Sequence, residues 1–256
     1  MGGNLKNFSP ELNCMKTLVL GDTHGRPFWK RIVEKEKDFD RMIFIGDYFD
    51  SREYTSVEQI DNFQEIIQYK QSGTCGEVIL LIGNHDYHYF KAIGNQNTSG
   101  YQRDAAAEIE KVIDGNREHL QMAFKMDNFL FTHAGVSKVF MDISFGKENW
   151  KTVNIADDLN KLFLIRPRAF MFNGVEPSGD DIYQTPIWIR VESLLLANKG
   201  SLEHELIQVF GHTQFHTIST VGKITKGRYQ LIDCLGTSGE YMIIENRSIF
   251  YRKYHD

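Results

Sequence analysis

The sequence predicts an α/β fold with a partly parallel sheet, and two observations support this fold class. The first is a strand–helix–strand–helix–strand rhythm within residues 15–83. The second is that each of the three apolar strands ends at a glycine, which a polar cluster follows. Because ligands of α/β folds bind outside the carboxyl ends of the strands, we expect the functional site at these strand ends.

The elements of this rhythm are short. Apolar runs that end at a glycine predict buried strands. Ser56 and Gln59 resemble a capping box at the start of a segment whose apolar residues keep helical spacing. In chain order, we expect a strand at 15–20, a helix at 26–37, a strand at 41–46, a helix at 56–70 and a strand at 77–83.

The rhythm changes after residue 94, where we expect a helix at 104–113 and a strand at 128–135. Residues 137–204 show no clear alternation, and we interpret them as an insert or cap. Within this segment we expect helices near 155–165 and 187–198 and a loop at 173–181. A strand at 206–212 follows, and strands at 228–236, 240–246 and 248–254 are expected to close a second sheet.

The composition excludes several classes of protein. A net charge of −5 over 256 residues gives no electrostatic footprint for a nucleic-acid duplex or an anionic membrane. No run of 18 apolar residues is present, so we expect no membrane span. Three widely spaced cysteines without a CxxC pair disfavour a disulfide framework and suit a cytoplasmic location. We expect residues 1–14 to be a flexible lead-in without signal-peptide layout and residues 15–256 to form one domain.

Five predicted strand ends carry oxygen or imidazole donors beside a glycine. An aspartate such as Asp47 at the buried end of a strand is costly alone, but it becomes favourable when it bridges two divalent cations. Donor sets without thiolates suit Mn, Fe, Zn or Ni. Two such ions about 3.5–4 Å apart are used for phosphoryl hydrolysis, in which they polarise the phosphoryl oxygens and activate a water. The donors are Asp22 and His24, Asp47 and Asp50, Asn84 and His85, His133, and His212.

Five motifs, in one order along the chain, resemble the calcineurin-like metallophosphoesterase family. They are GDTHG (21–25), GDYFD (46–50), GNHD (83–86), THAG (132–135) and GHT (211–213). The resemblance implies a four-layer α/β/β/α sandwich with two facing mixed β-sheets. It also implies a phosphoester hydrolase, most similar to the bacterial and phage serine/threonine protein phosphatases. The substrate would be a phosphoprotein or a nucleotide, and a metal-activated hydroxide would attack it.

The resemblance implies a role for each motif residue. His85 would be the general acid, and Asp50 would orient it. Two divalent ions, Mn before Fe, Zn or Ni, would be held by Asp22, His24, Asp47, Asn84, His133 and His212. Asp86 is expected to support its turn. His88, His119, His204 and His255 have no motif around them, and we expect them to be structural or at the surface.

The chain departs from the family pattern at two places. GHTQ puts Gln214 where many members have a second histidine, so either Gln214 or a water would complete that metal's shell. DYFDSR moves Arg52 one residue beyond the family's phosphate-binding arginine. PIWIR (186–190) resembles a Trp-x-Arg segment of phage relatives, which makes Arg190 the first candidate for a phosphate clamp, since a planar bidentate donor suits a monoester.

Two alternatives to a phosphomonoesterase stay open. One is a nucleotide hydrolase, either a dinucleoside tetraphosphatase or a cyclic nucleotide phosphodiesterase. The other is a metal-dependent scaffold without activity, which the intact set of donors argues against. The sequence leaves the oligomeric state open.

Overall fold

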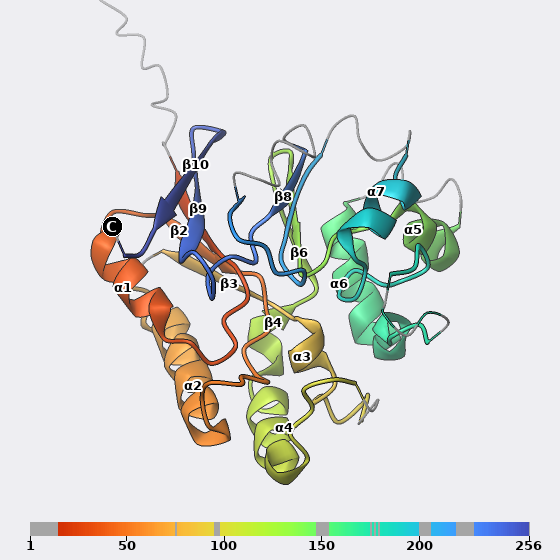
Figure 1. Ribbon diagram of the computed structural model, residues 1–256, viewed down its shortest axis with the longest axis horizontal. Coiled ribbons are helices and arrows are strands. Elements are labelled where there is room, and N and C mark those ends of the chain that lie inside the picture. Colours follow the sequence, from red (N-terminus) through yellow and green to blue (C-terminus); the bar gives the residue numbers. More distant parts are fainter. Residues whose placement is uncertain are drawn as a thin grey trace, which may run out of the picture.

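The computed structural model describes residues 15–74, 76–94, 98–146, 154–174, 176, 178, 180–199, 206–218 and 228–255. The expected lead-in (1–14), Cys75 and His204 lie outside these residues. Two mixed sheets form the centre of the molecule (Figure 1). The first has the order β10-β9-β1-β2-β3-β4, and the second has the order β5-β6-β7-β8.

The strands of the first sheet are parallel from β1 to β4, and β9 and β10 add an antiparallel edge. In the second sheet β6, β7 and β8 are parallel and β5 is antiparallel to β6. The strands are β1 (Lys16–Leu20), β2 (Arg41–Phe44), β3 (Glu77–Leu81), β4 (Leu120–Gln121), β5 (Ala123–Met126), β6 (Phe129–Thr132), β7 (Ile207–Phe210), β8 (Tyr229–Leu231), β9 (Glu240–Glu245) and β10 (Ser248–Lys253).

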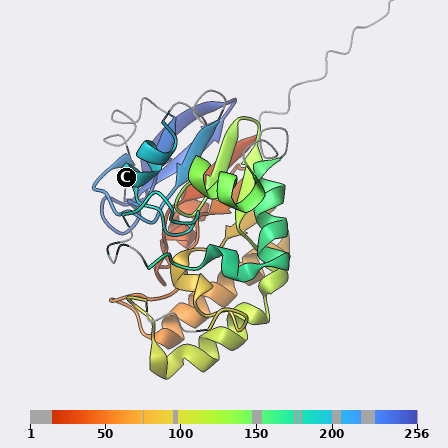
Figure 2. The ribbon, with the colours of Figure 1, turned by 90° about the vertical axis from the view of Figure 1, so that its right-hand side faces the viewer.

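Helices cover the outer faces of both sheets. Figure 1 shows α1 and α2 on one side of the pair of sheets and α5, α6 and α7 on the other. Figure 2 shows α6 along the outside of the molecule, next to the second sheet. The helices are α1 (Phe28–Lys35), α2 (Ser56–Ser72), α3 (Asn84–Tyr87), α4 (Ala106–Asp114), α5 (Lys138–Phe145), α6 (Ile155–Ile165) and α7 (Val191–Ala197), with short 3-10 turns η1 (Arg103–Ala105), η2 (Arg117–His119) and η4 (Pro167–Phe170).

The alternation of side chains along β1 divides the core into layers. Leu18 and Leu20 face the helical side, where they join a cluster that includes Trp29 of α1 and Phe63 of α2. Val19 faces the other way, into the apolar layer between the two sheets. This arrangement is the four-layer α/β/β/α sandwich that the sequence predicted, and that prediction is confirmed.

Two local predictions about strands and caps are wrong. Residues 240–246 and 248–254 do not close the second sheet, because β9 pairs with β1 through contacts such as Thr17 with Ile244. The capping box of α2 lies one residue earlier than expected: Thr55 accepts from the Glu58 backbone N–H, and Glu58 accepts from that of Thr55.

The segment expected as an insert or cap supplies the outer helices of the second sheet. Asn160 of α6 accepts backbone N–H groups of Met122 and Ala123, at 2.8 and 3.0 Å, and donates to the Ala123 carbonyl at 2.9 Å. Among the described residues, no helix is long and apolar enough to cross a membrane.

Candidate metal centre and its neighbours

The ends of strands from both sheets converge at one place. β1, β2 and β3 are parallel, so the residues that follow them lie at one edge of the first sheet. β6 and β7 of the second sheet bring two histidines to the same edge. Asp22, Asp47 and His133 are buried, and one ligand atom of each lies within 4.8 Å of the others.

The backbone of these strand ends is strained. L-residues with positive φ cost roughly 1–3 kcal/mol and concentrate at functional sites. Of the seven such residues in the described part of the chain, four are sequence-predicted site residues: His24 (43°), Asp47 (54°), Asp50 (61°) and His212 (66°). The turns aim their side chains at the shared edge.

Two glycines permit the close approach of the carboxylates. A Cβ added at Gly83 would lie 2.1 Å from Asp47 Oδ1, and one at Gly211 would lie 1.9 Å from Asp22 Oδ1. Neither gap admits a side chain. The glycines beside the polar residues, which the sequence showed, are therefore needed to pack the carboxylates against neighbouring strand ends.

Three histidines at this edge have their tautomers fixed by the backbone. A carbonyl oxygen only accepts, so the ring nitrogen that faces it carries the proton. The pairs are His24 Nδ1 with the Phe49 carbonyl (2.8 Å), His133 Nδ1 with that of Ile45 (3.1 Å) and His212 Nε2 with that of Trp188 (2.9 Å). The other nitrogen of each ring is left with an unshared electron pair.

These unshared pairs point at oxygens that cannot donate. His133 Nε2 and His212 Nδ1 lie 2.9 and 2.8 Å from Asn84 Oδ1. His24 Nε2 and His133 Nε2 lie 3.6 and 3.4 Å from Asp47 Oδ2. Lone pairs of nitrogen and oxygen that face one another repel. A cation placed between them would instead be bound by both atoms. A histidine that donates its other N–H to a carbonyl is also the usual geometry of a metal ligand, so these residues fit a metal centre.

Burial raises the pKa of the carboxylates, a shift that a cation would reverse, and lowers the pKa of the histidines, a shift that a cation would reinforce. Burial, and then the neighbouring Asp233 charge, raises the pKa of Asp22, and burial followed by the Asp22 charge raises that of Asp47. Burial lowers the pKa of His24 to about 4 and that of His133 to about 3, and it lowers that of His212 well below its usual value. The imidazoles are therefore neutral, as ligands must be.

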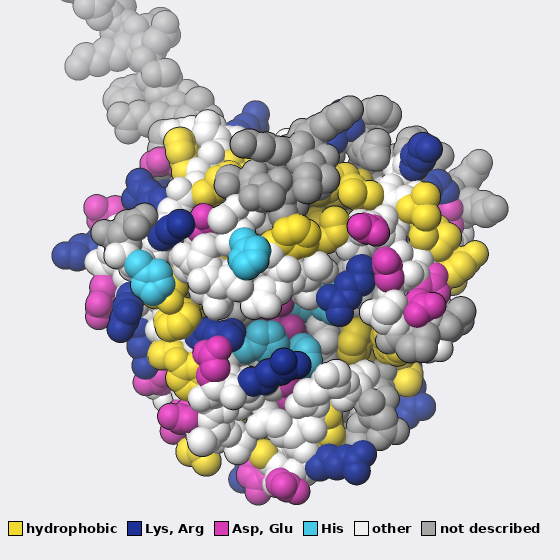
Figure 3. All heavy atoms as spheres, viewed as in Figure 1, with side chains coloured by type: hydrophobic (Ala, Val, Ile, Leu, Met, Phe, Trp, Pro, Cys, Tyr) yellow, Lys and Arg dark blue, Asp and Glu magenta, His cyan; other side chains and the backbone are white. Residues whose placement is uncertain are grey.

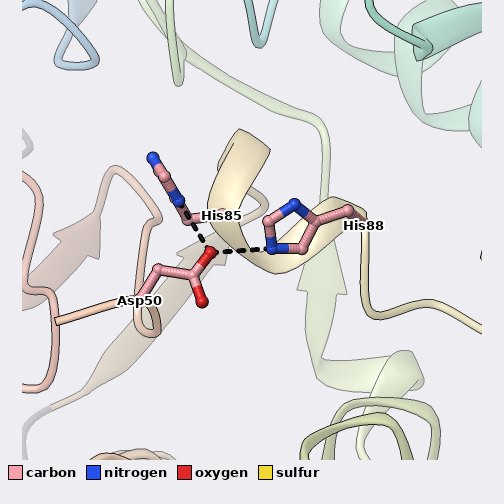
Figure 4. A group of neighbouring side chains, drawn as sticks. All are labelled: Asp50, His85 and His88. Carbon is pink, nitrogen blue, oxygen red and sulfur yellow. Dashed lines mark hydrogen bonds and ion pairs between the residues drawn. The ribbon is translucent and has the colours of Figure 1, made fainter. Parts of the chain in front are cut away.

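A second cluster surrounds Asp50 (Figure 4). His85 Nδ1–H donates to Asp50 Oδ2 at 2.8 Å, and His88 Nε2 lies 2.8 Å from the same oxygen. The other oxygen accepts from the Tyr89 hydroxyl (2.5 Å) and from Gln102 Nε2 (3.2 Å). Burial alone would raise the pKa of Asp50, but its interactions with the two histidines outweigh burial and hold the pKa at about 2. The structure thus joins His85 and Asp50, the pair that the sequence predicted.

Supporting residues surround both clusters. Asp86 accepts the backbone N–H groups of Asp47 (2.8 Å), Tyr48 (2.7 Å) and Gly83 (2.9 Å), which confirms its expected role in the turn. Asp233 was missed: burial raises its pKa to about 6, against the nearby Arg26 charge. The sequence did contain a signal for this residue, because Asp233 comes shortly after strand β8, just as the other donors come after their strands.

The two predicted arginines lie in different environments. Arg190 Nη1 donates to the His212 carbonyl at 3.2 Å, and its charge helps to lower the pKa of His133, after burial. Arg52 is exposed, and no hydrogen bond or ion pair between described residues joins it to the cluster. Gln214 is also exposed, and the described contacts do not connect it to the donors.

The clusters open to solvent in a hollow. Figure 3 shows histidine and acidic side chains at the centre of this face, with basic side chains around them. A separate cavity of about 640 Å³ is lined by residues of α5, of η4 and of the 183–185 segment, and none of the donors lines it. A hydrogen bond from the Tyr87 hydroxyl to the Pro167 carbonyl (2.6 Å) links the wall of this cavity to α3. The chemistry of the donor residues, and not this separate cavity, marks the site.

Comparisons with known proteins agree with this geometry. The sequence model of calcineurin-like phosphoesterases matches residues 15–216. The chain belongs to this family. The crystal structure of a cold-active protein-tyrosine phosphatase from the psychrophile Shewanella sp. has a TM-score of 0.62 at 19% identity, covering 94% of this chain and 78% of that one. Another structure of a cold-active protein tyrosine phosphatase has a TM-score of 0.57 at 20% identity, covering 94% and 76%. Curated proteins gave no match.

The family assignment confirms the predicted class of enzyme. This metallophosphoesterase is a phosphoester hydrolase. Its family depends on a dinuclear metal centre, and the described residues include candidate ligands for one. Its substrates are phosphorylated. The solved structures, at 19–20% identity, add the fold alone.

Proposed function

We propose that this metallophosphoesterase is a phosphomonoesterase that acts on a phosphoprotein. The observation that carries the proposal is a general acid next to the donor cluster: the rings of His85 and His24 are 5.1 Å apart between centroids. His85 is bonded to a carboxylate and is 22% exposed, so its outer nitrogen can reach a substrate. The Shewanella protein with the same fold is named a protein-tyrosine phosphatase, which supports a phosphoprotein substrate.

The metal ligands of the proposal divide between two ions that share Asp47. Asp22 and His24 would hold one ion, while Asn84, His133 and His212 would hold the other. We propose Mn as the resident metal. When bound, the ions supply Lewis-acid stabilisation of the phosphoryl oxygens and activation of a water nucleophile.

The remaining chemistry belongs to the chain's own side chains. The acid step needs both ring nitrogens of His85 protonated: Nδ1–H donates to Asp50, and Nε2–H is the proton that would pass to the departing oxygen, which leaves the ring neutral. Asp50 holds the tautomer and the ring plane of His85. Arg190, next to the His212 carbonyl, would bind the non-bridging oxygens of a monoester dianion with its planar fork.

The first test separates monoesters from diesters. With added Mn, we expect turnover of p-nitrophenyl phosphate and little turnover of bis-p-nitrophenyl phosphate. Turnover of the diester alone would indicate a phosphodiesterase, and metal binding without turnover of either ester would indicate a scaffold.

The second test addresses the substrate. Peptides that carry phosphoserine, phosphothreonine or phosphotyrosine are compared with diadenosine tetraphosphate at equal concentration, with release of phosphate as the measurement. We expect faster release from at least one of the phosphopeptides. A preference for the nucleotide would replace our proposal with a nucleotide hydrolase.

A further inference from the structure

We propose that His88 is a positioning residue of the phosphatase reaction, which acts through Asp50 to hold the general acid His85. The inference rests on the proposed function of His85. His88 has no motif around it, and the sequence suggested only a structural or surface role. The structure places His88, which is 1% exposed, beside the carboxylate that orients the acid.

The three side chains form a chain through one oxygen atom (Figure 4). Asp50 Oδ2 lies between His85 Nδ1 and His88 Nε2, at 2.8 Å from each. On the far side of the ring, His88 Nδ1 lies 2.6 Å from Thr98 Oγ1. If the Thr98 hydroxyl donates to Nδ1, the proton of the neutral ring is on Nε2, facing Asp50.

Within the described residues, His88 Nε2 has no aligned hydrogen-bond partner, and Asp50 is its ion-pair contact. A buried ring nitrogen without a partner is costly. Since Asp50 Oδ2 is within reach, a small rotation of the ring is enough to align the N–H with that oxygen. His88 is therefore committed to Asp50 and not to solvent.

The partners of Asp50 separate this arrangement from a third metal site. His85 Nδ1–H donates to Asp50 Oδ2, and the Tyr89 hydroxyl and Gln102 Nε2 donate to the other oxygen. The carboxylate thus already accepts hydrogen bonds from donors at both oxygens. The two histidine nitrogens that face Asp47 Oδ2, at 3.4 and 3.6 Å, carry unshared pairs instead.

The segment 98–102 covers this group and fixes it from outside. Thr98 holds the His88 ring, and Gln102 Nε2 donates to the second oxygen of Asp50. Between them, Gly100 has φ of +88°, and a Cβ there would lie 2.9 Å from His85 Cε1. The backbone thus lies against the acid's own ring. Loss of His88 would free Asp50 Oδ2 on one side and let both the carboxylate and His85 turn.

The test uses two esters that differ in their need for an acid. p-Nitrophenolate leaves without a proton, whereas phenolate, whose pKa is about 10 as in tyrosine, needs one. In the manganese-loaded full chain, His88→Phe should raise the ratio of kcat/KM for p-nitrophenyl phosphate over phenyl phosphate by about 10-fold or more. His88→Gln keeps an N–H donor at similar reach and should recover most of the loss. His119→Phe is the control, because the His119 ring contacts Gln71 and Glu118, and it should leave the ratio unchanged.

A variant of Thr98 keeps the proposal testable if His88→Phe does not fold. Thr98→Val leaves the imidazole in place but removes its fixed tautomer, and it should raise the same ratio a few-fold. The inference is wrong if His85→Ala raises the ratio but neither the His88 nor the Thr98 variant does. It is also wrong if the His88 and Thr98 variants slow both esters equally. In either case the proposed function stands. If the wild-type chain hydrolyses neither ester, the proposed function fails and takes this inference with it.

Discussion

Two neighbouring clusters of aspartate and histidine have the composition of metal sites, and they are built in opposite ways. Around Asp47, the histidine nitrogens that face inward carry unshared pairs, because their N–H groups are given to backbone carbonyls. Around Asp50, the partners are donors: a ring N–H, a tyrosine hydroxyl and an amide. One carboxylate faces acceptors and lacks positive charge, whereas the other is saturated.

The ionisation of the two carboxylates reflects this difference. Burial, and then the Asp22 charge beside it, raises the pKa of Asp47, and among the described residues no side chain donates a hydrogen bond to it. Burial acts on Asp50 as well, yet its interactions with His85 and His88 bring its pKa down to about 2. What decides which cluster favours a bound cation is therefore whether the neighbouring side chains turn lone pairs or hydrogen-bond donors towards the carboxylate, and not the residue types.

The largest expected effect comes from a substitution of Asp47. Asp47→Asn removes the charge that both ions would share, so turnover of p-nitrophenyl phosphate should fall to roughly a thousandth or less. Metal bound per chain, measured by elemental analysis after gel filtration, should fall with it. Asp38→Asn, an exposed carboxylate, is the matched control and should change neither quantity. Full activity in Asp47→Asn would refute the shared-ligand assignment.

The next effect belongs to the Asp50 side. His85→Ala should lower kcat for phenyl phosphate, whose leaving group needs a proton, by about 10²–10⁴ while bound metal stays at the wild-type level, since the general acid is lost and the metal ligands are not. Single-turnover kinetics and elemental analysis on one sample measure both. A parallel loss of metal would show that His85 is a ligand, and the two clusters would then be one.

The sequence predicted that these residues lie together because they follow strands. Asp22, Asp47 and Asn84 each come after an apolar run and a glycine, and parallel pairing of β1, β2 and β3 brings such positions together. The same logic would have included Asp233, had the end of β8 been searched for a donor. The local sequence pattern, together with the parallel pairing of the strands, therefore predicts which residues meet at the site.

Contacts between distant segments could not be predicted. Gln102 reaches Asp50 across 52 residues of chain, and Thr98 fixes His88 from a loop without regular structure. The pairing of β9 with β1 joins segments more than 200 residues apart, and β4 is two residues long, too short to show periodicity. Local periodicity does not encode partners, so these features depend on tertiary packing.

A smaller effect separates the two arginines. Arg190→Ala should raise KM for p-nitrophenyl phosphate by roughly 10–100-fold, the cost of about 1.5–3 kcal/mol for a hydrogen bond to a charged group. Arg52→Ala should change KM less, because the side chain is exposed and makes no described contact with the donor cluster. Steady-state kinetics of both variants decides between them. The reverse order would assign the phosphate clamp to Arg52.

The smallest effect concerns stability and sharpens the electrostatic contrast. The pKa of Asp50 is about 2 in the folded chain, against 3.8 for an ordinary aspartate. The unfolded chain therefore binds more protons between these values, and the stabilisation of about 2 kcal/mol is full above about pH 5 and disappears as the pH falls towards 2. Urea unfolding in the presence of a chelator should show Asp50→Asn destabilised by about this amount at pH 6 and progressively less at pH 4 and 3. A difference that stays constant over this range would mean that Asp50 acts through packing, and its charge would then contribute nothing to holding His85 and His88.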